Sequence, residues 1–524
     1  MICGNTPYRS SPGPIKYWRA AIISLLILSG VPFTSFAQNR PKDETQQVLK
    51  AAAKLTRAGS FPESEKMLRT ALAAEPNRSD IKVELAFVLS KQHKLRDAYD
   101  LCVPVAQAEP NNSRVFAVLG FVFLGAGRFT DARKVFLNSL TLNRREDLAW
   151  SGFGMLDFYE NRIDESLANL REAVDRKPDE PDYWFALAQV SARSEKYKEA
   201  ADAYDHFLDV SKSPDKDRRA RIIGLVNFLR FLGERERLYA TAGADFTAVD
   251  FDLVGNRPII KLKVNGRPEP LKFVLDTGSG ITVISEDTAR KLKIKAVTQG
   301  GFARGLGGDG KFEIVYGFVR QIGIGNVTIH GVPVYIRKFH GSQSDVDGYI
   351  GLALISKFLT TIDYGKHTFS LSKKDADARE FRGNTSLSLP LRLTSSGFLS
   401  GEVQLEGVES PLNFIVDTGA SISVISDGVA NKTEMLPFAK DEKLTVIGSA
   451  GITDDVRTYI LPKVTFGNHS RSQISAIALN LDLINEASGF EQAGILGGNF
   501  LRNYKLTFDF KNSKVEFIPL STEN

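Results

Sequence analysis

Cysteine is nearly absent from this chain of 524 residues. The two cysteines are Cys3 and Cys102, and removal of an N-terminal leader, argued below, would leave Cys102 alone. No intrachain disulfide can then brace the mature protein, which excludes the small disulfide-stabilised scaffolds. Cys102 is expected to be a buried packing residue rather than a reactive thiol.

Metal-binding and serine-hydrolase motifs are also missing. The six histidines form no metal-ligand spacing, and no serine occupies a Gly-x-Ser-x-Gly turn. Gly305, Gly307 and Gly310 fit the spacing of a dinucleotide-binding loop, but residues 311–316 read as a strand where a helix should begin. The sequence therefore predicts no metal and no other cofactor.

A strong excess of one charge is lacking as well. The formal net charge is +5, from 67 Lys and Arg against 62 Asp and Glu, and residues of the two signs are interleaved. This pattern argues against nucleic-acid binding. With 43% apolar and 25% charged residues, the chain falls in the globular range and is long enough for about three domains.

Long apolar runs are confined to the N-terminus. Lys16 and Arg19 precede the apolar stretch 20–30, which is followed by the small-residue motif Ser35-Phe36-Ala37. This order predicts a secretory signal peptide over residues 1–37. We therefore expect an exported protein, periplasmic or secreted, with no membrane span after cleavage. An uncleaved anchor formed by the same segment, with the rest facing outside the cytoplasm, is the alternative.

A repeat with a period of 34 residues occupies the first half of the chain, as Pro76 and Pro110 illustrate. Two further columns keep this period. The first holds small or polar turn residues, and the second, two positions later, holds apolar residues. They are Gly59, His93, Gly127, Asn161 and Glu195, followed by Phe61, Leu95, Phe129, Ile163 and Tyr197. The columns predict a helix, a tight turn and a second helix in each unit.

The period and the columns resemble the tetratricopeptide repeat family. The resemblance covers about residues 43 to 213 in about five units, and residues 216–238 are expected to form a capping helix, giving a helical domain over residues 43–238. Each unit buries its apolar face only against its neighbours, so the array should curve and present a concave surface. The resemblance implies binding of an extended peptide or a partner protein. A spacer or dimerisation arm without a ligand is the alternative.

The second half of the chain contains two copies of one sequence unit. From Phe251 onward, short alternating apolar runs separated by Gly, Asn and Asp predict strands and turns, and Asn265-Gly266 indicates a hairpin. Residues 273–285 return as residues 414–426 with the same pattern. A second match closes each copy, where Tyr349-Ile350-Gly351 aligns with Ile495-Leu496-Gly497. Two copies of a mostly β unit are the simplest account.

Each copy carries Asp-Thr-Gly after an apolar run, at Asp276-Thr277-Gly278 and Asp417-Thr418-Gly419. With the downstream apolar-apolar-Gly elements, these motifs resemble the aspartic peptidases, both the short retropepsin type and the two-lobed pepsin type. The expected fold is therefore multidomain: an N-terminal all-α array followed by a duplicated all-β domain. Its two lobes are expected over residues 251–373 and 388–520.

The resemblance implies that Asp276 and Asp417 are the catalytic residues. Two carboxylates in contact cannot both ionise, so the pair holds one proton, as in aspartic peptidases generally. One member can then deprotonate water while the other donates a proton to the substrate. By resemblance, Thr277 and Thr418 would hydrogen-bond across to the opposite loop.

Three other residues are expected to support this pair. Gly278 and Gly419 lack a Cβ and would let the two loops approach. Ser279 can donate a hydrogen bond near one carboxylate, whereas Ala420 cannot, so the lobes are chemically unequal.

In this family the region some thirty residues after each aspartate carries a flap hairpin that closes over substrate. The candidate flap and substrate residues are Gly307, Gly308, Tyr316, Gly448, Gly451 and Tyr459.

The leading hypothesis is an aspartic endopeptidase whose lobes pair within one chain and whose repeats recruit a peptide or protein substrate or a protein partner. Two alternatives remain open. Each lobe could pair with its equivalent in a second chain, so that only a dimer is active. The cleft could also capture extended peptides without cutting them.

Overall fold

The computed structural model describes residues 42–235, 237–374, 387–408 and 412–520 of the chain. The predicted signal peptide, 1–37, and Cys3 lie outside the described residues. Within the described ranges, no helix is long and apolar enough to cross a membrane. Cys102, on helix α4 (Leu95–Ala108), is fully buried, and burial raises the pKa of its thiol to about 12, as expected of a packing residue.

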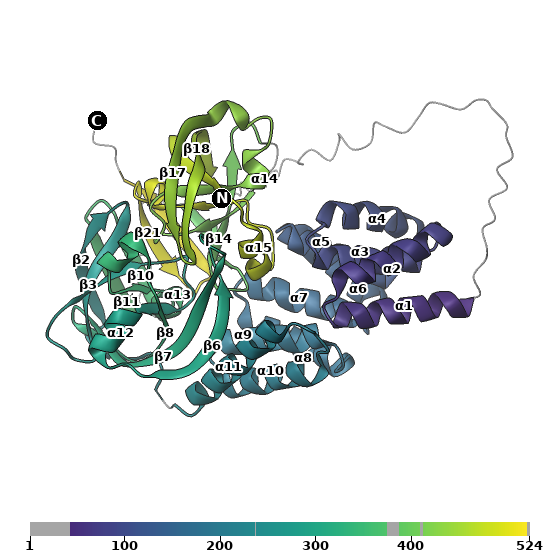
Figure 1. The fold of residues 1–524 in the computed structure, drawn as a ribbon, viewed down its shortest axis with the longest axis horizontal. Helices are drawn as coiled ribbons and strands as arrows, with labels where there is room; N and C mark the ends of the chain where they lie inside the picture. The colour runs from purple at the N-terminus through teal and green to yellow at the C-terminus, as the bar shows by residue number, and fades with distance from the viewer. Residues whose placement is uncertain (1–41, 236, 375–386, 409–411, 521–524) are drawn as a thin grey trace, which may run out of the picture. The chain divides into compact units, whose positions relative to one another are not determined.

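Eleven helices occupy residues 42–235 and form five consecutive pairs followed by a single final helix, as the purple-to-blue part of Figure 1 shows. The array matches the helical repeats predicted from the 34-residue period. The helices are α1 (Lys42–Arg57), α2 (Phe61–Ala74), α3 (Ser79–Lys91), α4 (Leu95–Ala108), α5 (Ser113–Gly125), α6 (Phe129–Leu142), α7 (Asp147–Tyr159), α8 (Ile163–Arg176), α9 (Pro181–Arg193), α10 (Tyr197–Val210) and α11 (Lys216–Gly233).

The turn column of the repeat explains where each unit reverses direction. All five of its residues adopt the left-handed backbone conformation, with φ between 57° and 79°. Such a residue ends a helix, because it turns the chain out of the helical path. The second helix of each pair then begins two residues later, at the apolar column: Phe61, Leu95, Phe129, Ile163 and Tyr197.

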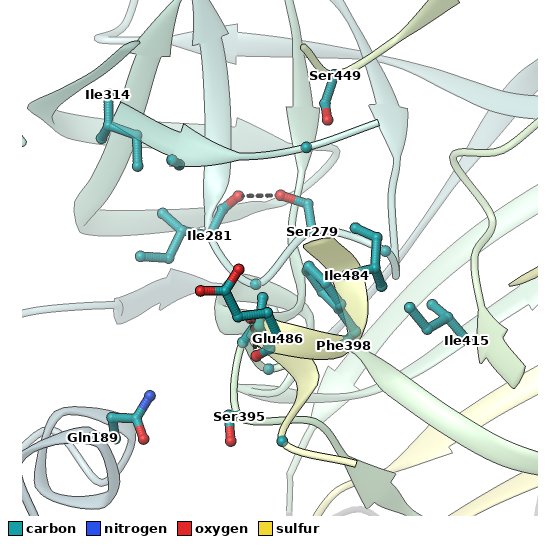
Figure 2. Close-up of a pocket in the computed structure, with 18 of the residues that line it drawn as sticks. Gln189, Ser279, Ile281, Ile314, Ser395, Phe398, Ile415, Ser449, Ile484 and Glu486 are labelled. Atoms are coloured by element: carbon teal, nitrogen blue, oxygen red, sulfur yellow. Dashed lines mark hydrogen bonds between the residues drawn. The ribbon is translucent and has the colours of Figure 1, made fainter. Parts of the chain in front are cut away.

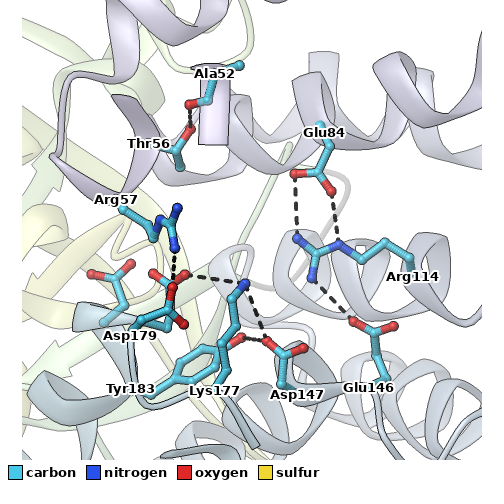
Figure 3. Close-up of polar contacts among 12 residues, drawn as sticks. Ala52, Thr56, Arg57, Glu84, Arg114, Glu146, Asp147, Lys177, Asp179 and Tyr183 are labelled. Carbon is cyan, nitrogen blue, oxygen red and sulfur yellow. Dashed lines mark hydrogen bonds and ion pairs between the residues drawn. The ribbon is translucent and has the colours of Figure 1, made fainter. Parts of the chain in front are cut away.

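Ion pairs join helices of different repeats (Figure 3). Arg114 on α5 bridges Glu84 on α3 and Glu146 before α7, with N–O distances of 3.0 and 3.2 Å. Arg57, at the end of α1, pairs with Asp179, which follows α8. The latter pair joins the first repeat to the end of the fourth, so the array curves back on itself as the expected superhelix would.

Strands dominate the remainder. The first lobe contains β1 (Ala240–Gly243), β2 (Phe246–Val254), β3 (Arg257–Val264), β4 (Leu271–Leu275), β5 (Thr282–Ser285), α12 (Glu286–Leu292), β6 (Ala296–Arg304), β7 (Lys311–Ile324), β8 (Val327–Arg337), β9 (Gly348–Ile350), α13 (Leu352–Ile355), β10 (Phe358–Asp363) and β11 (Thr368–Lys373). The second contains β12 (Leu387–Pro390), β13 (Arg392–Leu393), β14 (Leu399–Leu405), β15 (Leu412–Val416), β16 (Ser423–Ser426), α14 (Asp427–Ala430), β17 (Ala439–Gly448), β18 (Gly451–Phe466), β19 (His469–Leu479), α15 (Asp482–Ser488), β20 (Gly494–Leu496), α16 (Gly498–Leu501), β21 (Tyr504–Asp509) and β22 (Lys514–Pro519).

The strand pairing repeats as the sequence does. In the first lobe β9 lies between β4, its parallel partner, and β5, its antiparallel partner, and β5 pairs parallel with β8. In the second lobe β20, β15, β16 and β19 make the same pairings. The duplicated β domain is therefore confirmed, and the matching windows 273–285 and 414–426 are β4–β5 and β15–β16.

One sheet joins the two lobes. Its strand order includes β12-β22-β21-β10-β11-β2, and β10 of the first lobe pairs antiparallel with β21 of the second. A hydrophobic core continues through both lobes, and the equivalent residues Phe273 and Phe414 are fully buried in it. This shared sheet and core hold the loops after β4 and β15 in a fixed relation to each other.

Candidate active site

Asp276 and Asp417 occupy equivalent loops directly after β4 and β15. The backbone N–H of Asp276 donates to the carbonyl of Ile350, and that of Asp417 donates to Leu496, both at 3.0 Å. Ile350 and Leu496 end β9 and β20, so the downstream apolar-apolar-Gly elements anchor the two loops. The structure thus brings both predicted aspartates of one chain to the same place.

The glycine after each Asp-Thr pair lets the opposite carboxyl group approach. A Cβ placed on Gly278 would lie 2.4 Å from the carboxyl carbon of Asp417, and one on Gly419 would lie 2.6 Å from Oδ1 of Asp276. No real side chain fits at these distances. The backbone N–H groups of Gly278 and Gly419 also donate to Oδ1 of the aspartate in their own loop, at 2.9 and 2.7 Å.

The two threonines link the lobes beneath the carboxyl groups. The hydroxyl of Thr277 donates to the carbonyl of Val416, and the hydroxyl of Thr418 donates to Leu275, both at 2.7 Å. Each hydroxyl oxygen also accepts the backbone N–H of the other threonine, at 3.1 and 3.2 Å. Both side chains are fully buried. These four bonds are the cross-lobe contacts expected of the two residues.

Burial and mutual proximity set the electrostatics of the two carboxyl groups. Burial, and then the neighbouring Asp417, raise the pKa of Asp276 well above its ordinary value. Burial also raises the pKa of Asp417. The N–H groups of Gly278 and Gly419 act in the opposite direction by favouring the charged forms. The arrangement favours one shared proton.

This raised pKa predicts a pH-dependent cost to stability. The folded-state pKa of Asp276 lies above its unfolded value. The stability that protonated Asp276 gives the folded protein is therefore fully present below the unfolded pKa, and it is lost as pH rises through the folded pKa. Asp276→Asn has no such charge. We expect this variant to be more stable relative to wild type at pH 7 than at pH 4, with a free energy of unfolding larger by about 1.4 kcal/mol for each unit of pKa elevation. Urea unfolding of both proteins at the two pH values measures this, and an equal difference at both would contradict it.

The position of Ser279 corrects the sequence expectation. Its hydroxyl donates to the carbonyl of Ile281, two residues ahead, at 2.7 Å, as Figure 2 shows. A serine hydroxyl has a single hydrogen, so Ser279 does not donate to a carboxylate in this structure. The sequence difference between Ser279 and Ala420 therefore acts on the shape of the loop and not directly on the charge of the pair.

The candidate flap glycines meet above the aspartates. We call the β6–β7 turn, residues 305–310, the first flap tip, and the β17–β18 turn, residues 448–451, the second flap tip. Leu306 accepts the N–H of Ala450 at 2.8 Å, and Ile452 accepts that of Gly308 at 3.2 Å. A Cβ on Gly448 would lie 2.2 Å from the carbonyl oxygen of Leu306. Gly307, Gly308 and Gly451 have positive φ, so the junction depends on small residues.

The two candidate tyrosines are packing residues in this structure. Tyr316 is 3% exposed and stacks on Phe228 of α11, with ring centroids 4.5 Å apart. Tyr459 is 1% exposed, and its hydroxyl donates to the carbonyl of Ala430 at 3.3 Å. Tyr316 borders the cavity described below, but Tyr459 belongs to the core. This placement favours a packing role for Tyr459 over a substrate contact.

Sequence reasoning missed Arg337, at the end of β8. It is 7% exposed, and its guanidinium donates to the carbonyl of Ser449 in the second flap tip at 2.8 Å. Gln343 makes a similar bond to Gly448 at 3.2 Å. The charge of Arg337 also lowers the pKa of Asp276. A lone arginine outside any motif gives no signal in the sequence, so only the structure reveals that it connects a flap to the aspartates.

One cavity of about 1850 Å³ contains both aspartates and both flap tips. Side chains of the repeats line it as well, among them Gln189 on α9 (Figure 2). Helix α11 packs directly on the first flap: a Cβ on Gly224 would lie 2.2 Å from the carbonyl oxygen of Gln299, and Arg221 donates to Phe302 at 3.3 Å. The repeats are therefore part of the wall of the site.

The paired Asp-Thr-Gly loops, the flaps and the repeated strand pairing define an aspartic-peptidase-like domain preceded by helical repeats. The family model described as Aspartyl protease matches residues 260–354 and 401–500, and a Tetratricopeptide repeat model matches residues 151–215. The chain thus combines tetratricopeptide repeats with an aspartyl-protease-like domain in two segments.

Other similarities concern tetratricopeptide proteins. Human Tetratricopeptide repeat protein 13 is 24% identical over 123 residues, which are 24% of this chain and 14% of that protein, so the chain spans only a small part of this curated relative. The Thermus thermophilus protein TTC0263 is 20% identical over 34% of this chain and 98% of its own, with a TM-score of 0.30. Pseudomonas aeruginosa pilF is 18% identical over 36% and 88%, with a TM-score of 0.27.

Proposed function

We propose that this protein is an aspartic endopeptidase that hydrolyses peptide bonds with water activated by Asp276 and Asp417. The observation that carries the proposal is the close approach of two half-buried carboxyl groups from equivalent loops of one chain. Both lobes contribute one carboxyl group and one flap. An intramolecular pair accounts for these features without a second chain.

The proton shared by the two aspartates lets one act as a base and the other as an acid. The ionised carboxylate takes a proton from water as the water oxygen attacks the peptide carbonyl carbon. The protonated carboxyl group gives its proton to the carbonyl oxygen, which yields a neutral tetrahedral diol. A proton then passes to the peptide nitrogen, the C–N bond breaks, and an acid and an amine leave. The pair returns to one shared proton, so each turnover consumes one water and no other reactant.

The flaps would control access to this reaction. Their tips are joined by backbone hydrogen bonds, including that from Ala450 to Leu306, and substrate entry requires these bonds to open. Closure over an extended peptide would then exclude bulk water from the aspartates. Since α11 packs on the first flap, we expect the second flap to make the larger movement.

The repeats would recruit the substrate or a partner protein. Tetratricopeptide repeats are suited to protein–protein contacts because their inner face is long and concave. In this chain, side chains of the repeats and the two aspartates border one cavity. A polypeptide held by the helices would therefore lie close to the flaps. Export to the periplasm or the medium remains part of the proposal and rests on the N-terminal sequence alone.

The full-length protein should cleave a mixed decapeptide library between pH 3 and 7. Mass spectrometry in water enriched in ¹⁸O should find one ¹⁸O in each new carboxyl group, because water attacks directly. A pepstatin-type inhibitor should block cleavage, while a chelator and a serine-directed reagent should not. Intact peptides bound to the protein after long incubation at every pH would instead support a non-catalytic peptide-binding protein.

A further inference from the structure

Arg193 is a half-buried cation that borders the cavity without an acidic partner among the described residues. It is the last residue of α9 and borders the cavity that holds the aspartates. Within the described part of the chain, its guanidinium makes no ion pair and no hydrogen bond, and the hydroxyl groups of Tyr239 and Tyr197 act on its pKa. Burial lowers the pKa of Arg193, yet an arginine stays charged in proteins.

The position of Arg193 is next to the loop that carries Asp276. A Cβ placed on Gly397 would lie 3.3 Å from Nη1 of Arg193 and 3.8 Å from the Cα of Gly280. Gly280 follows Asp276 by four residues. Gln189, one helical turn before Arg193 on the same face of α9, borders the cavity too (Figure 2). A helix of the repeats thus presents a cation beside the aspartate loop and an amide to the same cavity.

Of two neighbouring cations at the cavity, one has an acidic partner and Arg193 has none among the described residues. Lys357, after α13, also borders the cavity, and it forms an ion pair with Glu195. Burial, followed by the charge of Arg193, lowers the pKa of Lys357 to about 8. Glu195 therefore neutralises one of two neighbouring cations. A half-buried guanidinium without an acidic partner is free to pair with an anion that enters the cavity.

We propose that Arg193 binds a carboxylate of the peptide substrate and makes the enzyme selective for an acidic residue near the scissile bond. The guanidinium would form a two-pronged pair with the carboxylate, and Gln189 could donate a further hydrogen bond. Four residues of chain separate Gly280 from Asp276 and span at most about 14 Å, which an extended peptide covers in about four residues. The acidic residue is thus expected within about four positions of the cleaved bond.

This inference rests on the proposed function, and its test separates the two. From one peptide cut in the library, a series is made with Glu, Gln or Lys at each of the four positions on either side of the bond. Wild type should show a kcat/KM for Glu at least about tenfold that for Gln at one position. Arg193→Gln should bring this ratio to about one, and Arg193→Glu should favour Lys there. Arg171→Gln, on the exposed pair with Glu199, should keep the wild-type ratio.

Each outcome has a defined meaning. A Glu preference that survives in Arg193→Gln overturns the inference and leaves the peptidase proposal intact. A preference removed by amidating the peptide C-terminus, with no effect of the side chains, assigns the carboxylate to the chain end. If no peptide is cut, fluorescence polarisation with Glu and Gln versions of one library decapeptide tests Arg193 by binding alone. Equal affinity of wild type for both versions would then overturn it.

Discussion

Asp276→Asn and Asp417→Asn should each reduce kcat for peptide cleavage at least about 10³-fold while the protein stays folded. Asparagine keeps an oxygen that can accept the N–H of Gly278 or Gly419, so the loops retain their bonds. It cannot take up or deliver a proton. General acid and base catalysis each contribute about 10² to 10⁴ in rate, and one lost member disables both roles. The double variant should therefore be no slower than either single variant.

Asp363→Asn is the matched control for these substitutions. Asp363 lies at the end of β10, and its carboxylate accepts the N–H groups of Gly365 and Lys366 at 3.1 and 3.0 Å, as a turn residue does. Its loss should cost about 1 kcal/mol of stability and change kcat by no more than about twofold. Loss of cleavage in this variant as well would show that the assay reports folding rather than chemistry.

Mixing the two inactive variants separates pairing within a chain from pairing between chains. When both aspartates of a site come from one chain, an equimolar mixture of Asp276→Asn and Asp417→Asn stays inactive. When the first lobe of one chain pairs with the second lobe of another, the mixture regains activity. When equivalent lobes pair, each variant alone retains a site of two intact aspartates. Rates measured over a range of protein concentrations distinguish the three cases.

The periodic parts of the fold were the most predictable from the sequence. The turn column fixed the end of the first helix in every repeat, because its residues are those that tolerate or adopt positive φ. The duplicated sequence predicted two β units, because two segments with the same pattern of apolar and turn residues are expected to form the same strand pairings. The end of the capping helix was less clear: α11 ends at Gly233, whereas the sequence prediction extended to Leu238.

The parts of the site that depend on contacts between repeats and lobes could not be predicted. Asp276, Asp417 and their threonines follow from local motifs, and their bonds are backbone-directed. Arg193 and Arg337 belong to no motif, and their importance comes from what the tertiary fold places beside them. The role of Ser279 could not be predicted either, because its hydroxyl donates to a carbonyl in its own loop and not to a carboxylate. A sequence pattern identifies which groups can bond, while packing decides which of them do.

Thr277→Val should destabilise the protein by about 2 to 6 kcal/mol and reduce cleavage at least about 10²-fold in the fraction that remains folded. Valine has nearly the same shape but neither donates nor accepts. It leaves the carbonyl of Val416 and the N–H of Thr418 buried without partners, and each such group costs about 1 to 3 kcal/mol. The same loss would let the carboxyl groups shift, and a displacement of about 1 Å can cost 10² in rate. Urea unfolding and steady-state kinetics measure the two effects.

Thr277→Ser distinguishes the hydrogen bonds from the packing of the methyl group. Serine keeps the hydroxyl, so cleavage should stay within about tenfold of wild type and stability within about 1.5 kcal/mol. Thr418→Val should resemble Thr277→Val, because its bonds to Leu275 and Thr277 are equivalent. The four bonds form one network, so the double variant should lose less than the sum of the single losses. Strict additivity, or a Thr277→Val protein as stable as wild type, would mean that the two loops are held by the shared sheet and not by these threonines.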